Sequence, residues 1–133
     1  MSEFRLVPRA ELPSRWDRIA ALLGPAVAMC NGELEADDIL ARALEGRMFV
    51  YADDDFAVTL EFIRYPRKTV MVVGFGAGKV PDRKLVEHTL VAAAAHFGAS
   101  SIRTFCRNPA MVRYYRRWFG MQPTYTVLEK ELA

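Results

Sequence analysis

Residues 98–121 read GASSIRTFCRNPAMVRYYRRWFGM, and this stretch decides the fold. The apolar and β-branched run at 102–106 predicts a strand. Asn108 is a typical N-cap residue, and Pro109 suits the first position of a helix. Gly120 is a typical residue for ending that helix. The stretch therefore predicts a strand at 102–106 followed by a helix over about 109–119.

The segment before this stretch predicts a second strand and a second helix. Residues 69–73 are a β-branched run, and residues 74–78, GFGAG, are expected to form a glycine-rich loop. Pro81 and Asp82 suit the start of a helix that runs to residue 97. A strand, a helix and a strand in this order predict two parallel strands, joined by a right-handed crossover.

The N-terminal half predicts two helices and an antiparallel meander. The expected helices are 11–23 and 35–44, and the expected strands are 4–7, 48–52, 56–65 and, at the end of the chain, 125–132. Gly24-Pro25 is expected to end the first helix, and 26–34 is either a loop or a short helical turn. The fold class is therefore α+β, with a mixed, mostly antiparallel sheet, flanking helices and one parallel βαβ crossover. No linker or repeat divides the chain, so residues 1–133 are expected to form one domain.

Composition excludes several classes of protein. The net charge is only +2 in 133 residues, which makes nucleic acid an unlikely partner. Cys30 and Cys106 lie far apart, and His88 and His96 are eight residues apart, so no metal site is expected. The longest apolar run, 90–95, is too short to span a membrane, and the N-terminus has no apolar signal core. We expect a cytoplasmic protein with no membrane span.

The carboxyl ends of the two parallel strands are the most promising place for a site. Ligands bind in the crevice outside the ends of neighbouring parallel strands. Glycines between a strand and a helix let backbone N–H groups approach an anion, although an ordinary turn explains 74–78 as well. One of Tyr114 and Tyr115 should point toward the sheet, where it is either a proton donor or an aromatic core residue.

The order of elements, with Asn108, Tyr115 and Gly120-Met121, resembles the GNAT superfamily of acyl-CoA-dependent N-acetyltransferases. The resemblance covers nearly the whole chain, and it implies acetyl-CoA as the acyl donor and a small-molecule or protein amine as the acceptor. It implies that Tyr115 or Tyr114 is the general acid and that Glu61, on strand 56–65, is the general base. Backbone groups of strand 69–73 would bind the acyl carbonyl. The cofactor-binding residues that it implies are Val72, Val73, Gly74, Gly76, Ala77, Gly78, Lys79 and Asn108.

Two features keep an alternative function open. The superfamily's diphosphate loop usually reads [QR]xxGx[GA], whereas here 74–79 has no leading Gln or Arg and Pro81 lacks an N–H. The alternative is a catalytically inactive GNAT-fold protein that binds a protein partner or itself. The -YPR- at 65–67 and the spacing of elements also resemble short GNAT-like proteins of tailed bacteriophages, which would place the protein in the host cytoplasm or the virion. Arg113, Arg116 and Arg117 share one helix face, which either contacts solvent or binds phosphate.

Overall fold

The computed structural model describes residues 3–132 and contains a five-stranded sheet in the order β1-β2-β3-β4-β5. Neighbouring strands are antiparallel except β4 and β5, which are parallel. The strands are β1 (Arg5–Leu6), β2 (Phe49–Ala52), β3 (Phe56–Arg64), β4 (Thr69–Gly78) and β5 (Ser101–Thr104). The α+β class, the meander and the parallel crossover are thus confirmed.

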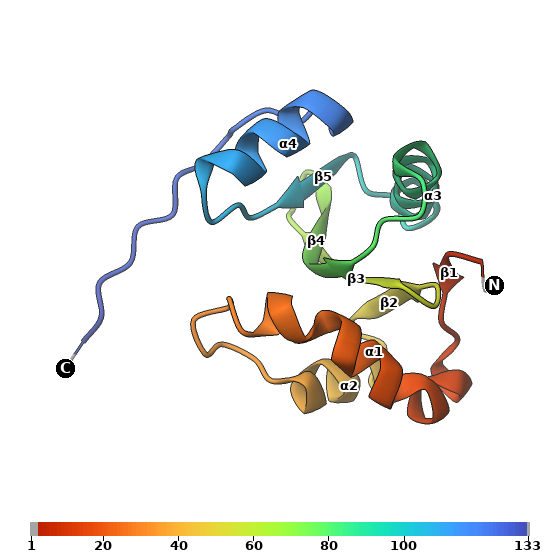
Figure 1. The fold of residues 1–133 in the computed structure, drawn as a ribbon. Coiled ribbons are helices and arrows are strands. Elements are labelled where there is room, and N and C mark those ends of the chain that lie inside the picture. Colours follow the sequence, from red (N-terminus) through yellow and green to blue (C-terminus); the bar gives the residue numbers. More distant parts are fainter. Residues whose placement is uncertain (1–2, 133) are drawn as a thin grey trace.

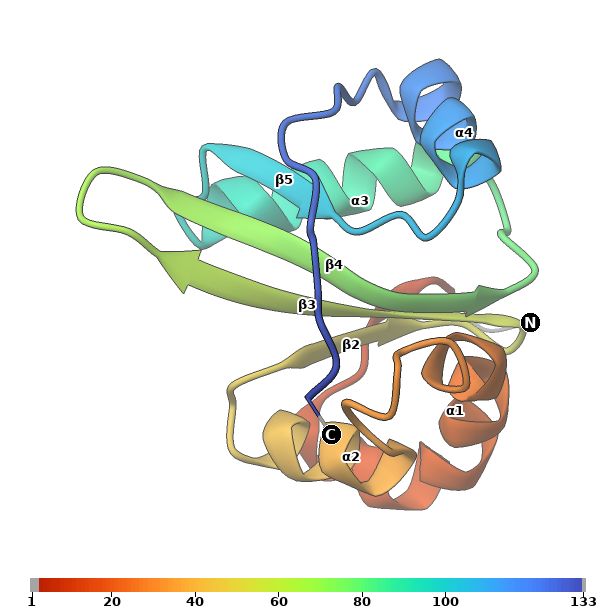
Figure 2. The same cartoon turned by 90° about the vertical axis from the view of Figure 1, so that its left-hand side faces the viewer.

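Helices cover both faces of the sheet, as Figures 1 and 2 show. The helical elements are a short 3-10 turn η1 (Arg9–Glu11) and the helices α1 (Leu12–Val27), α2 (Ala36–Leu44), α3 (Arg83–His96) and α4 (Pro109–Phe119). Helices α1 and α2 lie on one face of the sheet, and α3 and α4 lie on the other. The sheet therefore separates the chain into two layers of side-chain packing.

Each layer has its own core, because alternate residues of a strand point to opposite faces. Ala57 of β3 packs with the α1 and α2 side chains, including Trp16, Leu23 and Ile39. The expected apolar face of β3 (Phe56, Val58, Leu60 and Phe62) packs instead against α3. The two cores hold the sheet rigid from both sides, and this fixes the position of the β4–β5 edge.

Local capping explains why α4 matches the sequence prediction. The Asn108 side-chain oxygen accepts a hydrogen bond from the Met111 backbone N–H at 2.9 Å, and Pro109 occupies the first helical position. Gly120 ends the helix in the left-handed conformation, with φ 62°. Since all three signals act within the helix itself, they could be read without knowledge of the fold.

The prediction that Gly24-Pro25 ends the first helix was wrong, because α1 continues to Val27. Leu23 is fully buried and Val27 packs on the same core, so packing favours another turn of helix. Pro25 removes one backbone hydrogen bond close to the C-terminus, where few bonds remain to be lost. Tertiary packing has overridden the breaker signal.

Three strand predictions also change. Residues 74–78 are not a loop, since they form the second half of β4 and pair with β3. Strand 102–106 is instead β5, Ser101–Thr104, so Phe105 and Cys106 lie beyond it. The final strand at 125–132 was wrong, because this segment belongs to no strand or helix in the structure. The first and last of these corrections determine the shape of the candidate site and of the C-terminus.

Candidate active site

A β-bulge bends β4 in the middle of the sheet. Val58 pairs with Gly76 and Leu60 pairs with Val73, so the single residue Thr59 lies opposite two residues, Gly74 and Phe75. The Thr59 hydroxyl is buried and accepts a hydrogen bond from the Phe75 backbone N–H at 2.9 Å. A side chain at position 74 would lie 3.1 Å from the Thr59 Oγ1, which favours the glycine there. Thr59 thus gives the bulge a specific hydrogen-bond partner.

The bulge is also where β4 and β5 part. The parallel pairing covers Val70–Val73 of β4 and ends at the pair Val73 and Thr104. Beyond the bulge, Gly76, Ala77 and Gly78 pair only with β3. Gly78 has φ 106°, and a Cβ there would collide with the Asp55 carbonyl oxygen, so glycine is required at the end of β4. The sheet therefore opens between β4 and β5 at its carboxyl edge.

A pocket of about 330 Å³ fills this opening on the face covered by α3 and α4. Its walls come from both strands, from β3 and from both helices. The lining residues are Phe56, Val58, Val73, Gly76, Ala77, Gly78, Val80, Val86, Glu87, Leu90, Val91, Ile102, Thr104, Tyr114, Tyr115, Phe119 and Met121. Most of these side chains are apolar, and the few polar groups are a carboxylate and three hydroxyls. Such a lining is typical of small-molecule sites.

The three hydroxyls lie on β5 and α4. The rings of Tyr114, Tyr115 and Phe119 contact one another, with centroids 5.4 to 5.9 Å apart. Tyr115 shares a side-chain hydrogen bond with Thr104, whose hydroxyl donates to the Val73 carbonyl oxygen at 3.0 Å. A chain of polar groups therefore links the α4 tyrosine to the point where the two strands part.

Tyr115 is held in its protonated form. Burial raises the pKa of its phenol above the ordinary 10.0, and the nearby Cys106 and Tyr114 raise it further. The hydrogen bond with Thr104 acts in the opposite direction without reversing the shift. The phenol is thus a neutral hydroxyl at physiological pH and is able to donate a proton into the pocket.

The N-terminus of α3 does not offer the anion site that the sequence suggested. The Asp82 carboxylate accepts hydrogen bonds from the backbone N–H groups of Lys84 (2.9 Å) and Leu85 (3.3 Å). Pro81 has no N–H, and the Lys79 N–H donates to the Asp55 carbonyl oxygen. A carboxylate thus already occupies the positive end of the helix. The apolar pocket fits an acyl-pantetheine arm, whereas the backbone of 79–85 does not fit a diphosphate.

Cationic side chains lie beside this helix end. A second hollow, next to the pocket, is lined by residues 80–84 together with Glu87, Tyr114 and Trp118. The Arg83 guanidinium stacks on the Trp118 ring at 3.5 Å, and Arg117 lies 5.1 Å from the same ring. Side-chain cations, rather than helix amides, are therefore the groups available to a phosphate here.

The structure gathers six of the predicted site residues and separates five. Those that line the pocket are Val73, Gly76, Ala77, Gly78, Tyr114 and Tyr115. Val72 and Gly74 do not line it, and Lys79 is exposed with its N–H already bonded. Asn108 caps α4, so its side-chain oxygen serves the helix. Glu61 lies on the face covered by α1 and α2, where it forms an ion pair with Arg42 at 3.7 Å.

Sequence reasoning missed Thr104, Glu87 and the pair Arg83 and Trp118. Glu87 supplies a carboxylate to the pocket from α3, at a helix position whose neighbours Val86 and Leu90 face the core. Thr104 ends the predicted strand, so its place at the crevice could have been inferred from the same rule that selected the glycines. The Arg83–Trp118 contact joins two helices and leaves no local signal.

Two kinds of site are not found in residues 3–132. No group of three or more His, Cys, Asp or Glu side chains is arranged to hold a metal ion there. Within the same residues, no helix has the length and apolar character needed to cross a membrane.

Comparisons with known proteins identify the fold. No protein-family model matches the chain, and no curated protein matches it in sequence. Solved structures match along their whole lengths. An aminoglycoside acetyltransferase from an uncultured soil metagenomic sample, in complex with trehalose, is 10% identical with a TM-score of 0.70, and the match covers 98% of this chain and 96% of that one.

Two further acetyltransferases agree with it. One from Trypanosoma brucei is 12% identical with a TM-score of 0.61, covering 99% of this chain and 100% of that one. Glucosamine-6-phosphate N-acetyltransferase from Arabidopsis thaliana is 11% identical with a TM-score of 0.62, covering 100% and 99%. The chain therefore has a GNAT-like fold, and at these identities the likeness concerns the fold alone.

Proposed function

We propose that this protein is an N-acetyltransferase that moves an acetyl group from acetyl-CoA to an amine. The observation that carries the proposal is the pocket between β4 and β5, with the protonated Tyr115 in its wall. The fold is that of solved acetyltransferases. A site with this shape, an apolar lining and one buried proton donor suits an acyl thioester better than a strongly charged ligand.

Each part of the pocket has a role in this proposal. Apolar side chains of β3, β4 and α3 would surround the pantetheine arm. The backbone of β4 beside the bulge would bind the acyl carbonyl, since β5 no longer pairs with β4 there. Arg83 and Lys84 would contact the phosphates in place of helix amides. The donor supplies an acyl group activated as a thioester.

Proton transfer requires one acid and one base. Tyr115 would donate its proton to the departing thiolate, and the raised pKa keeps that proton in place until it is needed. Glu61 was the predicted base, but it lies on the opposite face of the sheet and is paired with Arg42. Glu87 lines the pocket itself and is the second candidate for the base. An acceptor that approaches through the opening between the strands would use Glu61, whereas one that enters beside α3 would use Glu87.

Titration calorimetry and acetyl transfer together test the proposal. We expect acetyl-CoA to bind and Tyr115→Phe to lower kcat by about 100-fold or more, with little change in donor affinity. Tyr51→Phe is the matched control, because Tyr51 is also half-buried but lies on β2, outside the pocket. Glu61→Gln and Glu87→Gln assign the base. No binding of acetyl-CoA at millimolar concentration would reject the function.

The Asp82 cap favours a second candidate function, in which the GNAT-like domain no longer transfers an acyl group and serves as an interaction protein. A carboxylate fixed at the start of α3 repels a diphosphate, and this is the expected state of a site that has lost its donor. The bacteriophage virion role remains a prediction from the sequence. Acetyl transfer that depends on Tyr115 would contradict this second candidate.

A further inference from the structure

The C-terminal arm, residues 122–132, is the segment of the structure that its own chain leaves uncovered. Figures 1 and 2 show it leaving the end of α4 and extending away from the folded body. Its large apolar side chains are Tyr125, Val127, Leu128 and Leu132, and they are 76%, 70%, 89% and 85% exposed. So much exposed apolar surface in a short segment is typical of an interaction site.

The residues of the arm favour a strand. Residues 124–128 read TYTVL, a run of β-branched and aromatic residues with high strand propensity. No proline or glycine follows Pro123. An extended segment of this kind lacks only a partner strand, because its backbone N–H and C=O groups need hydrogen bonds from a neighbouring edge.

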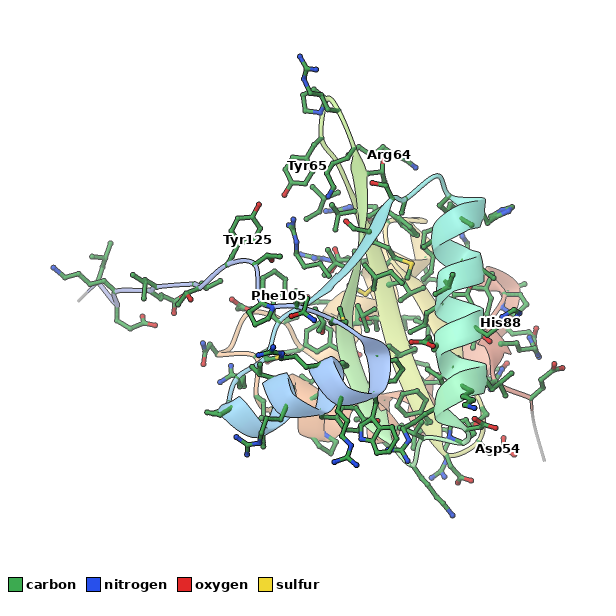
Figure 3. The ribbon with its side chains drawn as sticks, turned by 90° about the horizontal axis from the view of Figure 1, so that it is seen from above. Asp54, Arg64, Tyr65, His88, Phe105 and Tyr125 are labelled. Atoms are coloured by element: carbon green, nitrogen blue, oxygen red, sulfur yellow. The ribbon has the colours of Figure 1, made fainter. Side chains whose placement is uncertain are left out.

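The outer edge of β5 is such a partner. β5 is the last strand of the sheet and pairs with β4 on one side only. Figure 3 shows Tyr65, Phe105 and Tyr125 on the side of the molecule beside β5, far from His88 on α3. Phe105 directly follows β5 and is 57% exposed. An open strand edge with exposed aromatic neighbours is a template for another strand.

The arm does not use this edge in its own copy. Tyr125 lies against β5, with its ring 5.2 Å from the Arg103 guanidinium. After Tyr125 the arm runs across the direction of the strands rather than alongside β5, as Figure 2 shows. The exposure of Val127, Leu128 and Leu132 confirms that the rest of the arm has left the body. A second copy presents the same edge to the departing arm.

Charge favours one direction of pairing. The arm carries Glu129 and Glu131 near its end, and exposed Arg64, Arg67 and Lys68 lie around the β3–β4 hairpin. The Ser100 N–H donates to the Thr69 carbonyl oxygen, so the hairpin lies next to the start of β5. An arm antiparallel to β5 would bring its glutamates toward these cations.

We propose that the arm forms an additional antiparallel strand on β5 of a second copy, which places its own arm on β5 of the first. Such an exchange is a closed two-fold dimer with the same contact made twice. It would also buttress the site, because the arm starts directly after Met121 and β5 ends at Thr104, and both residues line the pocket. The proposal is independent of the acetyltransferase function.

Light scattering and sedimentation of the full chain test the exchange. We expect a dimer with twice the 15.0 kDa chain mass. Thr126→Pro and Val127→Pro each remove one N–H of the arm, and because N–H groups alternate along a strand, one of the two must face β5. That variant should weaken the dimer by about tenfold or more, whereas Thr126→Ala, which keeps the N–H, should not. Circular dichroism verifies that each variant is folded.

Isotope-filtered NMR on a mixture of labelled and unlabelled chains identifies the owner of the arm. Contacts between the arm of one chain and β5 of the other support the exchange. The proposal is overturned by a monomer, by arm–β5 contacts confined to one chain, or by a dimer that neither proline variant weakens.

Discussion

Replacing Thr59 by valine tests whether the bulge in β4 depends on one hydroxyl. Valine has the shape of threonine, so the change removes a hydrogen-bond acceptor and leaves the packing volume almost unaltered. The Thr59 side chain is completely buried, and the Phe75 N–H that it accepts is partly buried. A buried donor left without a partner costs about 1–3 kcal/mol. Because Phe75 is only partly buried, we expect the lower part of this range, about 1–2 kcal/mol.

Urea unfolding measures the loss, and amide hydrogen exchange assigns it to the bulge. Thr59→Val should lower the unfolding midpoint without changing the slope m, because the folded surface is the same. Exchange at the Phe75 amide should accelerate through local opening, while amides within α1 change no more than the global loss requires. Thr59→Ser is the matched control, since it keeps the hydroxyl and removes only a methyl group. It should lose stability while leaving the Phe75 amide protected.

Two results would refute this reasoning. One is a Thr59→Val protein as stable as the natural chain within about 0.3 kcal/mol, which would mean that the bulge N–H finds water or another partner at no cost. The other is equal Phe75 exchange in the valine and serine variants. Either would show that packing alone holds the bulge.

Three further predictions concern the ends of β4 and α3 and the pocket tyrosine. Gly78→Ala places a Cβ against the Asp55 carbonyl at φ 106° and should cost about 3 kcal/mol or more in urea unfolding, whereas Gly24→Ala, in α1 with open space around it, should be neutral or stabilising; equal effects would contradict the conformational argument. Asp82→Asn keeps a capping side chain but removes the negative charge, so acetyl-CoA should bind several-fold more tightly by calorimetry, with a change in stability of less than about 1 kcal/mol. Unchanged affinity would mean that the phosphates lie elsewhere. Because the folded pKa of Tyr115 is raised above its unfolded value, its contribution to stability is complete below pH 10 and is lost as pH rises through the folded pKa. Unfolding followed from pH 8 to 11 should therefore show a steeper alkaline loss for the natural chain than for Tyr115→Phe, and parallel curves would contradict the burial of this phenol.

The parts of the fold that follow from local chemistry could be predicted from the sequence. Asn108, Pro109 and Gly120 each act on the backbone within one or two turns, so α4 was predicted with its observed limits. The alternation of Phe56, Val58, Leu60 and Phe62 gave β3 its buried face for the same reason. Signals of this kind need no information about distant segments.

The errors occur where a distant partner decides the structure. Glycines in 74–78 favour a loop on intrinsic grounds, but the neighbouring strand β3 supplies pairing that holds them in β4. The arm at 125–132 shows the reverse case, because strand propensity alone forms no strand when no edge accepts it. Propensity was misleading in both directions, according to whether a partner was present.

The candidate site was predicted in part for the same reason. The rule that ligands bind beyond the carboxyl ends of parallel strands correctly brought the glycines of β4 together with Tyr114 and Tyr115. It could not show that Asp82 caps α3 or that Arg83 stacks on Trp118, because these contacts depend on side-chain rotamers and on the separation of two helices. Nor could it place Glu61 relative to the pocket.

The bulge in β4 makes the length of one strand a determinant of the site. Two residues of β4 occupy the space opposite Thr59, so a deletion of one residue at 74 or 75 would leave β3 and β4 in continuous register. Every side chain of β4 after that point would then change faces. Such a shortened strand would keep its hydrogen bonds and its neighbours, and it would continue alongside β5 instead of diverging. In this fold, then, the difference between an open and a closed sheet edge amounts to a single codon.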